Sequence, residues 1–444
     1  IGFGQFFGAN IFNSQAFAKF IMGSYYKGQS LNIRFDSVFA TLYNPNCASM
    51  FFAMMFCAVG IMAVFMPIKN KVKIPLIVLA VILLVALVGT NGAGGFIGTV
   101  AGVGISAIVA ICYYVFKVKS PKAIIACVIA IVIAIGAVVV FFNTDNKIVA
   151  KINIITEALK DGQSLGGSAS FYEDVNVDGE TATVITKDGN YTIDYAEAGT
   201  QLMHNGNVLT PVSIEPMESQ KDGKTYTFNE SGMTWKMMIY GNNATLVGVD
   251  PQGTETYFMF SEVDGKLSMV DRFGTPVDLN VPVESFGFKG VERLGSNRGY
   301  IYSRSIPLLK HNIILGAGAD NFVLEFPQQD IKSKLEFLGD PYVIIDKPHN
   351  MFLQMGINDG CIALLVMIAL FVLYVAQTIK RIFTDNNKYL QAVRYGLIAG
   401  CIAYMITGLT TDSVVSVAPV FWIMLGAGFG VNMIGNEKQE EKIK

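Results

Sequence analysis

The residues best suited to chemistry lie at Pro348-His349-Asn350, where a polar stretch gives way to a long apolar run. Histidine has an unperturbed pKa of about 6.5, so His349 could exchange a proton with a substrate near neutral pH. A titratable group at the start of a membrane span is costly unless it is solvated or partnered, which favours a functional role. The alternative interpretation is a boundary histidine that anchors the helix end at the lipid surface.

Three arginines outside the apolar runs could bind a phosphorylated ligand, namely Arg34, Arg298 and Arg304. A guanidinium group keeps its charge and can hold two phosphate oxygens at once. The sequence predicts a helix over 297–311, on which Arg298 and Arg304 would lie about a third of a turn apart and could frame one ligand. Such a site needs neither a metal nor a cofactor. Each arginine could instead be an interface anchor or a salt-bridge partner.

The other histidines and the cysteines have structural interpretations. His204 precedes Asn205-Gly206 and is expected at a solvated hairpin position, whereas His311 is expected to cap the end of the predicted helix. All six cysteines fall within predicted membrane spans, and none forms a CxxC pair. The sequence therefore predicts no metal site and no disulfide framework.

The composition indicates a membrane protein. Of the 444 residues, 52% are hydrophobic and 15% are charged, and the mean hydropathy is +0.44. The apolar residues come in blocks close to the roughly 20 residues that cross a bilayer's hydrocarbon layer. The predicted spans are 47–66, 72–88, 96–116, 123–142, 351–379, 392–409 and 414–434. With a net charge of -2 and no basic stripe, a nucleic-acid partner is not expected.

Lysine and arginine residues mark alternate connections between these spans and so predict the orientation. The marked positions are Lys69, Lys71, Lys73, Lys117, Lys119, Lys122, Lys380, Arg381, Lys388, Arg394, Lys438, Lys442 and Lys444. The connections 89–95 and 410–413 contain neither residue type. By the positive-inside rule the C-terminus is cytoplasmic, and the segments 1–46 and 143–350, which include His349, are external. Because the chain opens at Ile1 without an apolar signal sequence, we expect a fragment that lacks N-terminal spans.

The segment 165–288 is predicted to be an antiparallel β sandwich or barrel. Short alternating runs such as 181–186 and 235–240 are separated by dipeptides such as Asp178-Gly179 and Asn205-Gly206, which suit tight hairpins. Its acidic residues are scattered, so no calcium loop is predicted; both a solvated scaffold and a glycan- or partner-binding module remain open.

The predicted organisation is an external segment 1–46, four spans within 47–142, a linker 143–164, the β insertion 165–288, a helical catalytic-loop region 289–350, three spans within 351–434 and a tail 435–444.

Three groups of residues, in this order along the chain, resemble the O-antigen ligase and O-antigen polymerase superfamily. The first is Arg34 followed by the stretch 41–46, Thr-Leu-Tyr-Asn-Pro-Asn; the second is Asn297-Arg298-Gly299 with the Leu-Gly-Ala-Gly turn at 315–318. The third is the run 348–360, which begins Pro-His-Asn and precedes a long apolar helix. The sequence departs from the family pattern at 90–95, which lacks an arginine, at Asp359, where Glu is frequent, and at Ile313, where Pro is frequent.

This resemblance implies an α-helical polytopic protein of the bacterial cytoplasmic (inner) membrane with a large external loop. It implies a metal-independent, cofactor-free glycosyltransferase whose donor is a glycan on undecaprenyl diphosphate and whose acceptor is a glycan, lipid or protein hydroxyl. His349 would take the acceptor proton, Asn350 would orient the imidazole or a sugar hydroxyl, and Arg34, Arg298 and Arg304 would bind the diphosphate. Direct attack would invert the anomeric centre.

Two other classes of function are compatible with the sequence. One is a polytopic polysaccharide transporter or flippase, although the predicted spans are almost free of charge. The other is a membrane-anchored surface binding protein that uses the β insertion.

Overall fold

The chain forms two structural units, each described here by itself. The computed structural model describes residues 1–8, 11–28, 37–42, 44–121, 125, 170–196, 199–218, 220, 222–263 and 265–440. The helical unit comprises Ile1–Ile152, Asn312–Gly318 and Lys347–Lys444, and the β unit comprises Asn153–His311 and Ala319–Asp346. Arg34, the predicted linker 143–164 and all of the predicted span 123–142 except Ile125 lie outside the described residues.

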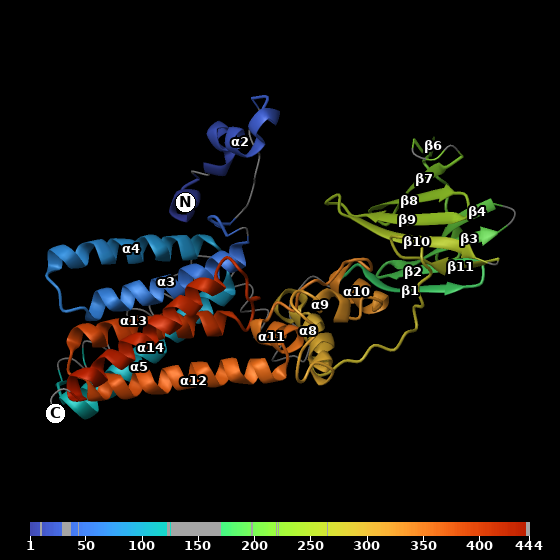
Figure 1. The fold of residues 1–444 in the computed structure, drawn as a ribbon. Helices are drawn as coiled ribbons and strands as arrows, with labels where there is room; N and C mark the ends of the chain where they lie inside the picture. Colours follow the sequence, from blue (N-terminus) through green and yellow to red (C-terminus); the bar gives the residue numbers. More distant parts are fainter. Residues whose placement is uncertain are drawn as a thin grey trace. The chain divides into compact units, whose positions relative to one another are not determined.

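Long apolar helices build the helical unit (Figure 1). They are α3 (Pro45–Phe65), α4 (Asn70–Gly89), α5 (Ala93–Tyr113) with a π-helical turn η3 (Tyr114–Val118), α12 (Cys361–Thr384), α13 (Lys388–Thr407) and α14 (Ala418–Glu440). In the described part of the chain, five helices are long and apolar enough to cross a membrane, namely all of these except α14, whose apolar part is Ala418–Ile434. The expectation of a helical membrane protein is therefore confirmed at this level. Short helices α1 (Gly2–Phe6), η1 (Ile11–Asn13), α2 (Gln15–Met22) and η2 (Gly23–Tyr25) precede α3.

Small residues allow α3, α5 and α13 to pack with their backbones close together. A Cβ atom at Gly98 of α5 would lie 2.5 Å from the carbonyl oxygen of Ala403 in α13, and one at Gly102 would lie 2.5 Å from that of Ala399. A Cβ atom at Gly400 of α13 would lie 2.8 Å from the carbonyl oxygen of Met54 in α3. Such close approach strengthens dispersion contacts between membrane helices. Because α13 packs on both α3 and α5, it is the central helix of the unit.

The predicted span 351–379 is not one helix. Its first part forms α11 (Met351–Asn358), and α12 begins at Cys361 after Asp359 and Gly360. Gly360 has φ +99°, a conformation that L-residues with a side chain rarely adopt and that a helix cannot contain. The prediction of a continuous helix was wrong because the apolar residues continue on both sides of this break.

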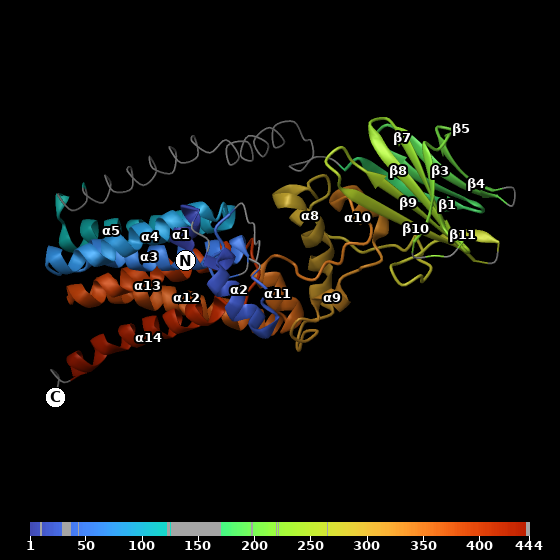
Figure 2. The ribbon, with the colours of Figure 1, turned by 90° about the horizontal axis from the view of Figure 1, so that it is seen from above.

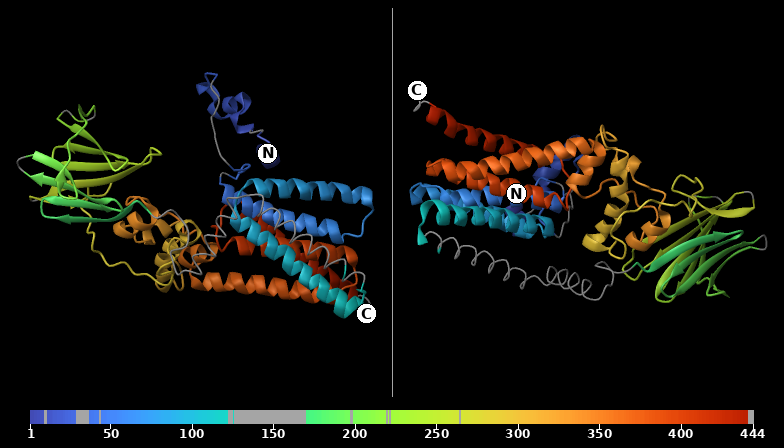
Figure 3. Two further views of the ribbon diagram at one scale, coloured as in Figure 1. Left: turned by 180° about the vertical axis from the view of Figure 1, so that it is seen from behind. Right: turned by 90° about the horizontal axis from the view of Figure 1, so that it is seen from below.

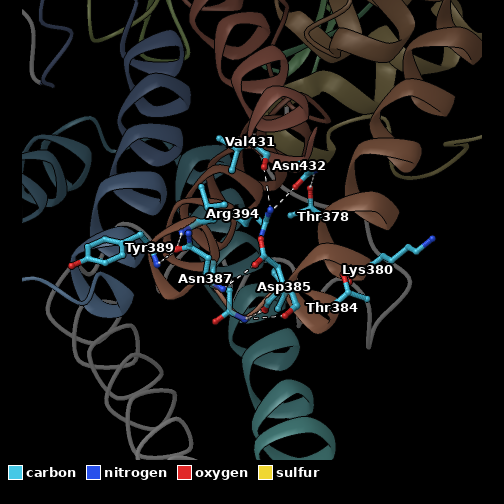
Figure 4. Close-up of polar contacts among 12 residues, drawn as sticks. Thr378, Lys380, Thr384, Asp385, Asn387, Tyr389, Arg394, Val431 and Asn432 are labelled. Carbon is cyan, nitrogen blue, oxygen red and sulfur yellow. Dashed lines mark hydrogen bonds and ion pairs between the residues drawn. The ribbon is translucent and has the colours of Figure 1, made fainter. Parts of the chain in front are cut away.

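Arg394 is not in a connection, as the orientation argument assumed, but inside α13 (Figure 4). Its side chain is 1% exposed, and Nη1 donates to Asp385 Oδ2 at 2.8 Å. Nε donates to Asn432 Oδ1 at 3.2 Å and Nη2 to the carbonyl oxygen of Val431 at 3.1 Å. Asn432 in turn donates to Thr378 Oγ1 at 2.9 Å. The guanidinium thus joins α13 to α14 and, through Asn432, to α12, so its charge is compensated where it is buried.

Two antiparallel sheets form the β unit. One has the order β1-β2-β3-β4-β5 and the other β11-β10-β9-β8-β7-β6, so within each sheet every strand pairs with its neighbours in the chain. The strands are β1 (Tyr172–Asp178), β2 (Thr181–Thr186), β3 (Gly189–Ala196), β4 (Gly199–His204), β5 (Asn207–Val208), β6 (Ser213–Pro216), β7 (Lys224–Glu230), β8 (Met233–Tyr240), β9 (Asn243–Val249), β10 (Glu255–Val263) and β11 (Lys266–Met269). Val184 and Ile193 of the first sheet share a core with Trp235 and Phe258 of the second. Figures 2 and 3 show the two sheets face to face. The antiparallel β region is therefore confirmed, and it is a sandwich.

Of the predicted turn dipeptides, some form tight hairpin turns and others lie in longer connections. Asn205 and Gly206, between β4 and β5, have φ +50° and +80°, as a two-residue hairpin requires. Gly223 lies in a longer connection before β7 and does not have positive φ. A Cβ atom there would approach Met217 Sδ to 2.8 Å, so this glycine is explained by close packing instead.

Short helices complete the β unit after the sandwich. They are α8 (Leu294–Ser305), the 3-10 helix η4 (Ile306–Lys310), α9 (Phe322–Glu325) and α10 (Ile331–Leu338). Regular helix in α8 begins at Arg298, because residues 295–297 all have positive φ. Ile331 and Leu335 of α10 are buried in the sandwich core. The β insertion and the helical region that follows it therefore share one hydrophobic core.

Candidate functional site

His349 forms an ion-pair contact with an aspartate in the helical unit. Its Nδ1 lies 2.8 Å from Oδ2 of Asp412, which belongs to the connection between α13 and α14. The Asp412 side chain is 9% exposed and that of His349 is 43% exposed. A carboxylate on Nδ1 favours the tautomer that carries its proton there, which makes Nε2 the basic nitrogen. The pair thus combines a partly exposed imidazole with a nearly buried carboxylate, an arrangement in which the carboxylate can stabilise an imidazolium.

The start of α11 holds the Asp412 connection on both sides. Before Asp412, the backbone N–H of Met351 donates to the carbonyl oxygen of Gly408 at 2.8 Å. After it, Gln354 Oε1 accepts from the N–H of Ser413 at 2.7 Å, and Gln354 Nε2 donates to the Ser413 carbonyl at 3.3 Å. These bonds fix the backbone on either side of the carboxylate. The geometry of the His349–Asp412 pair is thus determined by elements other than the pair itself.

Asn350 is the N-cap of α11. Its Oδ1 accepts from the N–H groups of Phe352 and Leu353 at 2.9 and 3.1 Å, and its Nδ2 donates to the carbonyl oxygen of Leu409 at 3.0 Å. The resemblance implied that Asn350 orients the imidazole or a sugar hydroxyl; among the described contacts, Nδ1 of the imidazole is held by Asp412. Asn350 instead positions His349 indirectly, because it joins the start of α11 to the connection that contains Asp412.

Asp412 is almost fully enclosed within the helical unit. Its second oxygen, Oδ1, is buried and has no hydrogen-bond partner within the described ranges. Cys47, in the first turn of α3, shares a buried cluster with Met351 of α11, so the start of α3 lies at this end of the unit. The Asn-Pro-Asn stretch caps α3 there: Asn44 accepts from the N–H of Asn46 at 2.8 Å and Pro45 takes the first helical position. Buried polar atoms left unsatisfied are rare and call for an explanation, such as a catalytic role.

Arg304 is part of a buried network in the β unit. Its Nε donates to Asp330 Oδ2 at 3.0 Å, with side-chain exposures of 13% and 9%. Nη1 donates to Ser303 Oγ at 2.9 Å and Nη2 to Ser333 Oγ at 3.1 Å. The guanidinium carbon also lies 4.9 Å from the centre of the Tyr300 ring. Every nitrogen of this guanidinium is engaged, which is typical of an arginine that stabilises the fold.

Arg298 differs from Arg304 although both lie on α8. It is half-buried, and its side chain forms neither a hydrogen bond nor an ion pair with any residue that the structure describes. Residues 295–297 turn the chain sharply just before it, which places Arg298 at the start of the regular helix. Of these two arginines, Arg298 is the one with a guanidinium available to a ligand. Arg34 lies outside the described residues.

The remaining histidines have structural surroundings. His204 was expected to be solvated, but its side chain is 13% exposed, so that expectation was wrong. Its Nδ1 lies 3.1 Å from Glu230 Oε1, and its ring stacks on that of Tyr191 with 4.5 Å between the ring centres. These contacts form because β4 turns the side chain toward the sandwich core. His311 follows the last residue of η4, at the end of the helical segment as expected.

Asp412 is the candidate site residue that was not predicted from the sequence. It is the acidic residue in the short connection 410–413, which was noted for its lack of lysine and arginine. An acid in a tight connection at the membrane boundary was the available signal. Within the described ranges, no group of three or more His, Cys, Asp or Glu side chains could hold a metal ion.

Compared with models of known families, with curated proteins and with solved structures, the chain matches none.

Proposed function

We propose that this protein is a glycosyltransferase of the O-antigen ligase and O-antigen polymerase superfamily. In this proposal the donor is a glycan on undecaprenyl diphosphate, and the reaction takes place at the outer face of the cytoplasmic membrane. The observation that carries the proposal is the 2.8 Å contact between His349 Nδ1 and Asp412 Oδ2 at the start of α11. The contact supports a general base within the Pro-His-Asn run that resembles the family.

The proposed reaction is a direct displacement at the anomeric carbon. His349 Nε2 takes the proton from the acceptor hydroxyl as the new C–O bond forms, and the undecaprenyl diphosphate leaves with the bonding electron pair. Asp412 stabilises the imidazolium, and Asn350 keeps α11 against the Asp412 connection. A guanidinium group beside the leaving diphosphate would stabilise its charge. Arg34, Arg298 and Arg304 are the proposed contacts, and Arg298 has the strongest support because Arg304 is already bound to Asp330.

The test is glycan transfer by the purified full chain in proteoliposomes. The donor is the lipid-linked glycan extracted from the cells that make the protein, and the acceptors are lipid-linked glycan, lipid core and protein. His349→Gln should lower kcat by about 10² to 10⁴, the usual contribution of a general base. Asp412→Asn, which keeps the shape but favours the wrong imidazole tautomer, should lower kcat by about 10² without raising the KM for the donor.

Two matched variants control for nonspecific damage. His311→Gln removes an exposed histidine at the end of η4, and Asp359→Asn removes an exposed acid next to α11; both should retain full activity. Full activity of His349→Gln would refute the base assignment. The productive acceptor distinguishes the two subclasses, since growth of lipid-linked glycan indicates a polymerase and transfer to lipid core or protein indicates a ligase.

One observation favours a transporter as the second candidate. Arg394 is buried inside α13 and pairs with Asp385 just after α12, and ionisable residues inside membrane helices often mark a transport path. The same proteoliposomes test this alternative. Movement of a fluorescent lipid-linked glycan between leaflets, without formation of a glycosidic bond, would support transport and contradict the transferase.

A further inference from the structure

The segment 312–318 fills the break between α11 and α12. At one end, the carbonyl oxygens of Asn312 and Ile313 accept from the N–H groups of Cys361 and Ile362 at 3.0 and 3.1 Å. At its other end, the N–H groups of Ala317 and Gly318 donate to the carbonyl oxygens of residues 357 and 358, both at 2.8 Å. The segment therefore satisfies the first N–H groups of α12 and the last carbonyl groups of α11. Exposed backbone groups would be costly at a lipid boundary, so this pairing lets an interrupted helix exist there.

Two glycines make this contact possible. A Cβ atom at Gly316 would lie 2.4 Å from the carbonyl oxygen of Asn358, and one at Gly360 would lie 2.4 Å from that of Ile314. Both glycines have positive φ, +69° and +99°. The backbones of the segment and of the break are thus in direct contact, and the side chains between Asn312 and Gly316 cannot turn inward.

Three consecutive aliphatic side chains are left on the surface. Ile313 is 55% exposed, Ile314 67% and Leu315 85%. A run of exposed aliphatic residues held by a fixed backbone is uncommon on a water-facing surface and marks an interaction site. The partner must therefore be apolar.

The exposed surface of α12 identifies that partner. α12 is one of the five membrane-length helices, and Ile362, Leu365 and Val366 at its start are 51%, 64% and 62% exposed. The Ile362 N–H donates to the carbonyl oxygen of Ile313, so the aliphatic run begins one hydrogen bond away from the exposed apolar start of α12. The exposed apolar surface of the helix is continuous with that of the segment.

We propose that residues 313–315 insert into the acyl-chain boundary of the bilayer beside α12. The occupant of this surface is bulk membrane phospholipid, and the segment anchors the α11–α12 break at a fixed depth. His349 and Asp412 lie at the other end of α11, so anchoring the break also fixes the depth of the pair in the membrane. The inference depends on the membrane-length helices and not on the proposed transferase activity.

Photochemical labelling of the full chain tests this inference. p-Benzoylphenylalanine is placed at Leu315 in one variant, at Leu365 of α12 in a second and at Phe273 of the β unit in a third. Each variant is irradiated in liposomes of phosphatidylethanolamine and phosphatidylglycerol that contain a fluorescent-tailed phospholipid. Leu365 is the positive control for lipid contact. Phe273 is the control for exposure, because it is 93% exposed in a unit that contributes none of the five membrane-length helices.

The variant at Leu315 should label strongly with phospholipid, whereas the variant at Phe273 should show only background labelling. Labelling at Leu315 should approach that of the variant at Leu365. Equal labelling at Leu315 and Phe273, or a crosslink from Leu315 to a second copy of the chain instead of to lipid, would overturn the inference. Because the readout is lipid attachment, failure of the transferase proposal would leave this result unchanged.

Discussion

Arg298 and Arg304 lie on one short helix, yet their surroundings predict opposite effects of mutation. Arg304→Ala removes the cation that is hydrogen-bonded to the buried carboxylate of Asp330, which should destabilise the β unit by about 3 kcal/mol. Arg298→Ala removes a side chain that forms no polar contact in the described part of the chain, so its effect on stability should stay within about 0.5 kcal/mol. If the transferase proposal holds, Arg298→Ala should instead raise the KM for the donor.

The two tryptophans allow this comparison in the intact protein. Trp235 is buried in the sandwich and Trp422 lies on α14, so Trp422→Phe leaves Trp235 as the fluorescent reporter of the β unit. Urea unfolding in detergent micelles gives the free energy of unfolding of each arginine variant in this background. Equal destabilisation by both substitutions would contradict the separation of their roles.

The sequence could indicate His349 but not its partner. A histidine between polar and apolar segments is visible from residue types alone, whereas Asp412 is 63 positions away and meets it through the packing of α11 against the end of α13. For Arg394 the sequence pointed to the wrong place. A charged residue close to several lysines predicts a connection between helices, but Arg394 lies inside α13. Its burial depends on Asp385 and Asn432, which only the assembled helices bring together.

At the scale of elements, α5 provides a test of helix packing with an internal control. A Cβ atom at Gly98 would lie 2.3 Å from Thr407 Oγ1 and 2.5 Å from the Ala403 carbonyl oxygen, so Gly98→Ala must push α5 away from α13. A Cβ atom at Gly104, on the same helix, would have nothing within 4 Å, so Gly104→Ala adds helix propensity, worth up to about 1 kcal/mol, without a clash. We expect Gly98→Ala to lower the melting temperature of the helical unit and Gly104→Ala to leave it unchanged or raise it.

The measurement uses the complementary tryptophan variant. Trp235→Phe leaves Trp422 of α14 as the reporter, and its emission is followed during thermal unfolding in micelles. A melting temperature for Gly98→Ala that matches that of Gly104→Ala would show that α5 and α13 are not packed backbone to backbone.

Hydropathy located the long helices α3, α4, α5, α13 and α14, because a membrane-length helix needs a long apolar run, and alternation of apolar and polar residues located several strands. The predicted run 181–186 coincides with β2, and the run 235–240 lies within β8. The break at Gly360 could not be found in this way, since its cause is the pairing of residues 312–318 with two helix ends. The shared core of α10 and the sandwich was equally hidden, because Ile331 and Leu335 lie after the predicted insertion. Deletion of 165–288 would therefore expose these two residues as well as remove the strands.

At the scale of the whole molecule, the β unit should respond to pH through one buried lysine. Lys334 of α10 is 2% exposed and donates to the Gln328 carbonyl oxygen at 2.7 Å. Burial lowers the pKa of Lys334 from 10.5 to about 8, and the nearby carboxylate of Asp330 partly opposes this shift. Between these two pH values the unfolded chain binds more protons than the folded one, so the free energy of unfolding must rise with pH.

Buried tyrosines determine the pH above which the free energy of unfolding stops rising. Burial raises the pKa of Tyr172 to about 12 and also raises that of Tyr300 and Tyr342. The unfolded chain loses these phenol protons above a pH of about 10, before the folded chain does, and stability then falls with pH. The β unit should therefore be most stable between about pH 9 and 10, with a gain from pH 8 on the order of 1 kcal/mol, because the tyrosines offset part of the lysine contribution.

The variant Lys334→Met isolates the contribution of Lys334 to the pH dependence of the free energy of unfolding. Methionine fills a similar volume without a charge, so the variant should lose the rise between pH 8 and about 9 and retain the fall above pH 10. Urea unfolding of the full chain with Trp235 as the single tryptophan, repeated at each pH, gives both slopes. A wild-type free energy of unfolding that is flat or falling from pH 8 to about 9 would mean that Lys334 remains solvated in the folded protein. The same result would show that α10 does not close over the sandwich core.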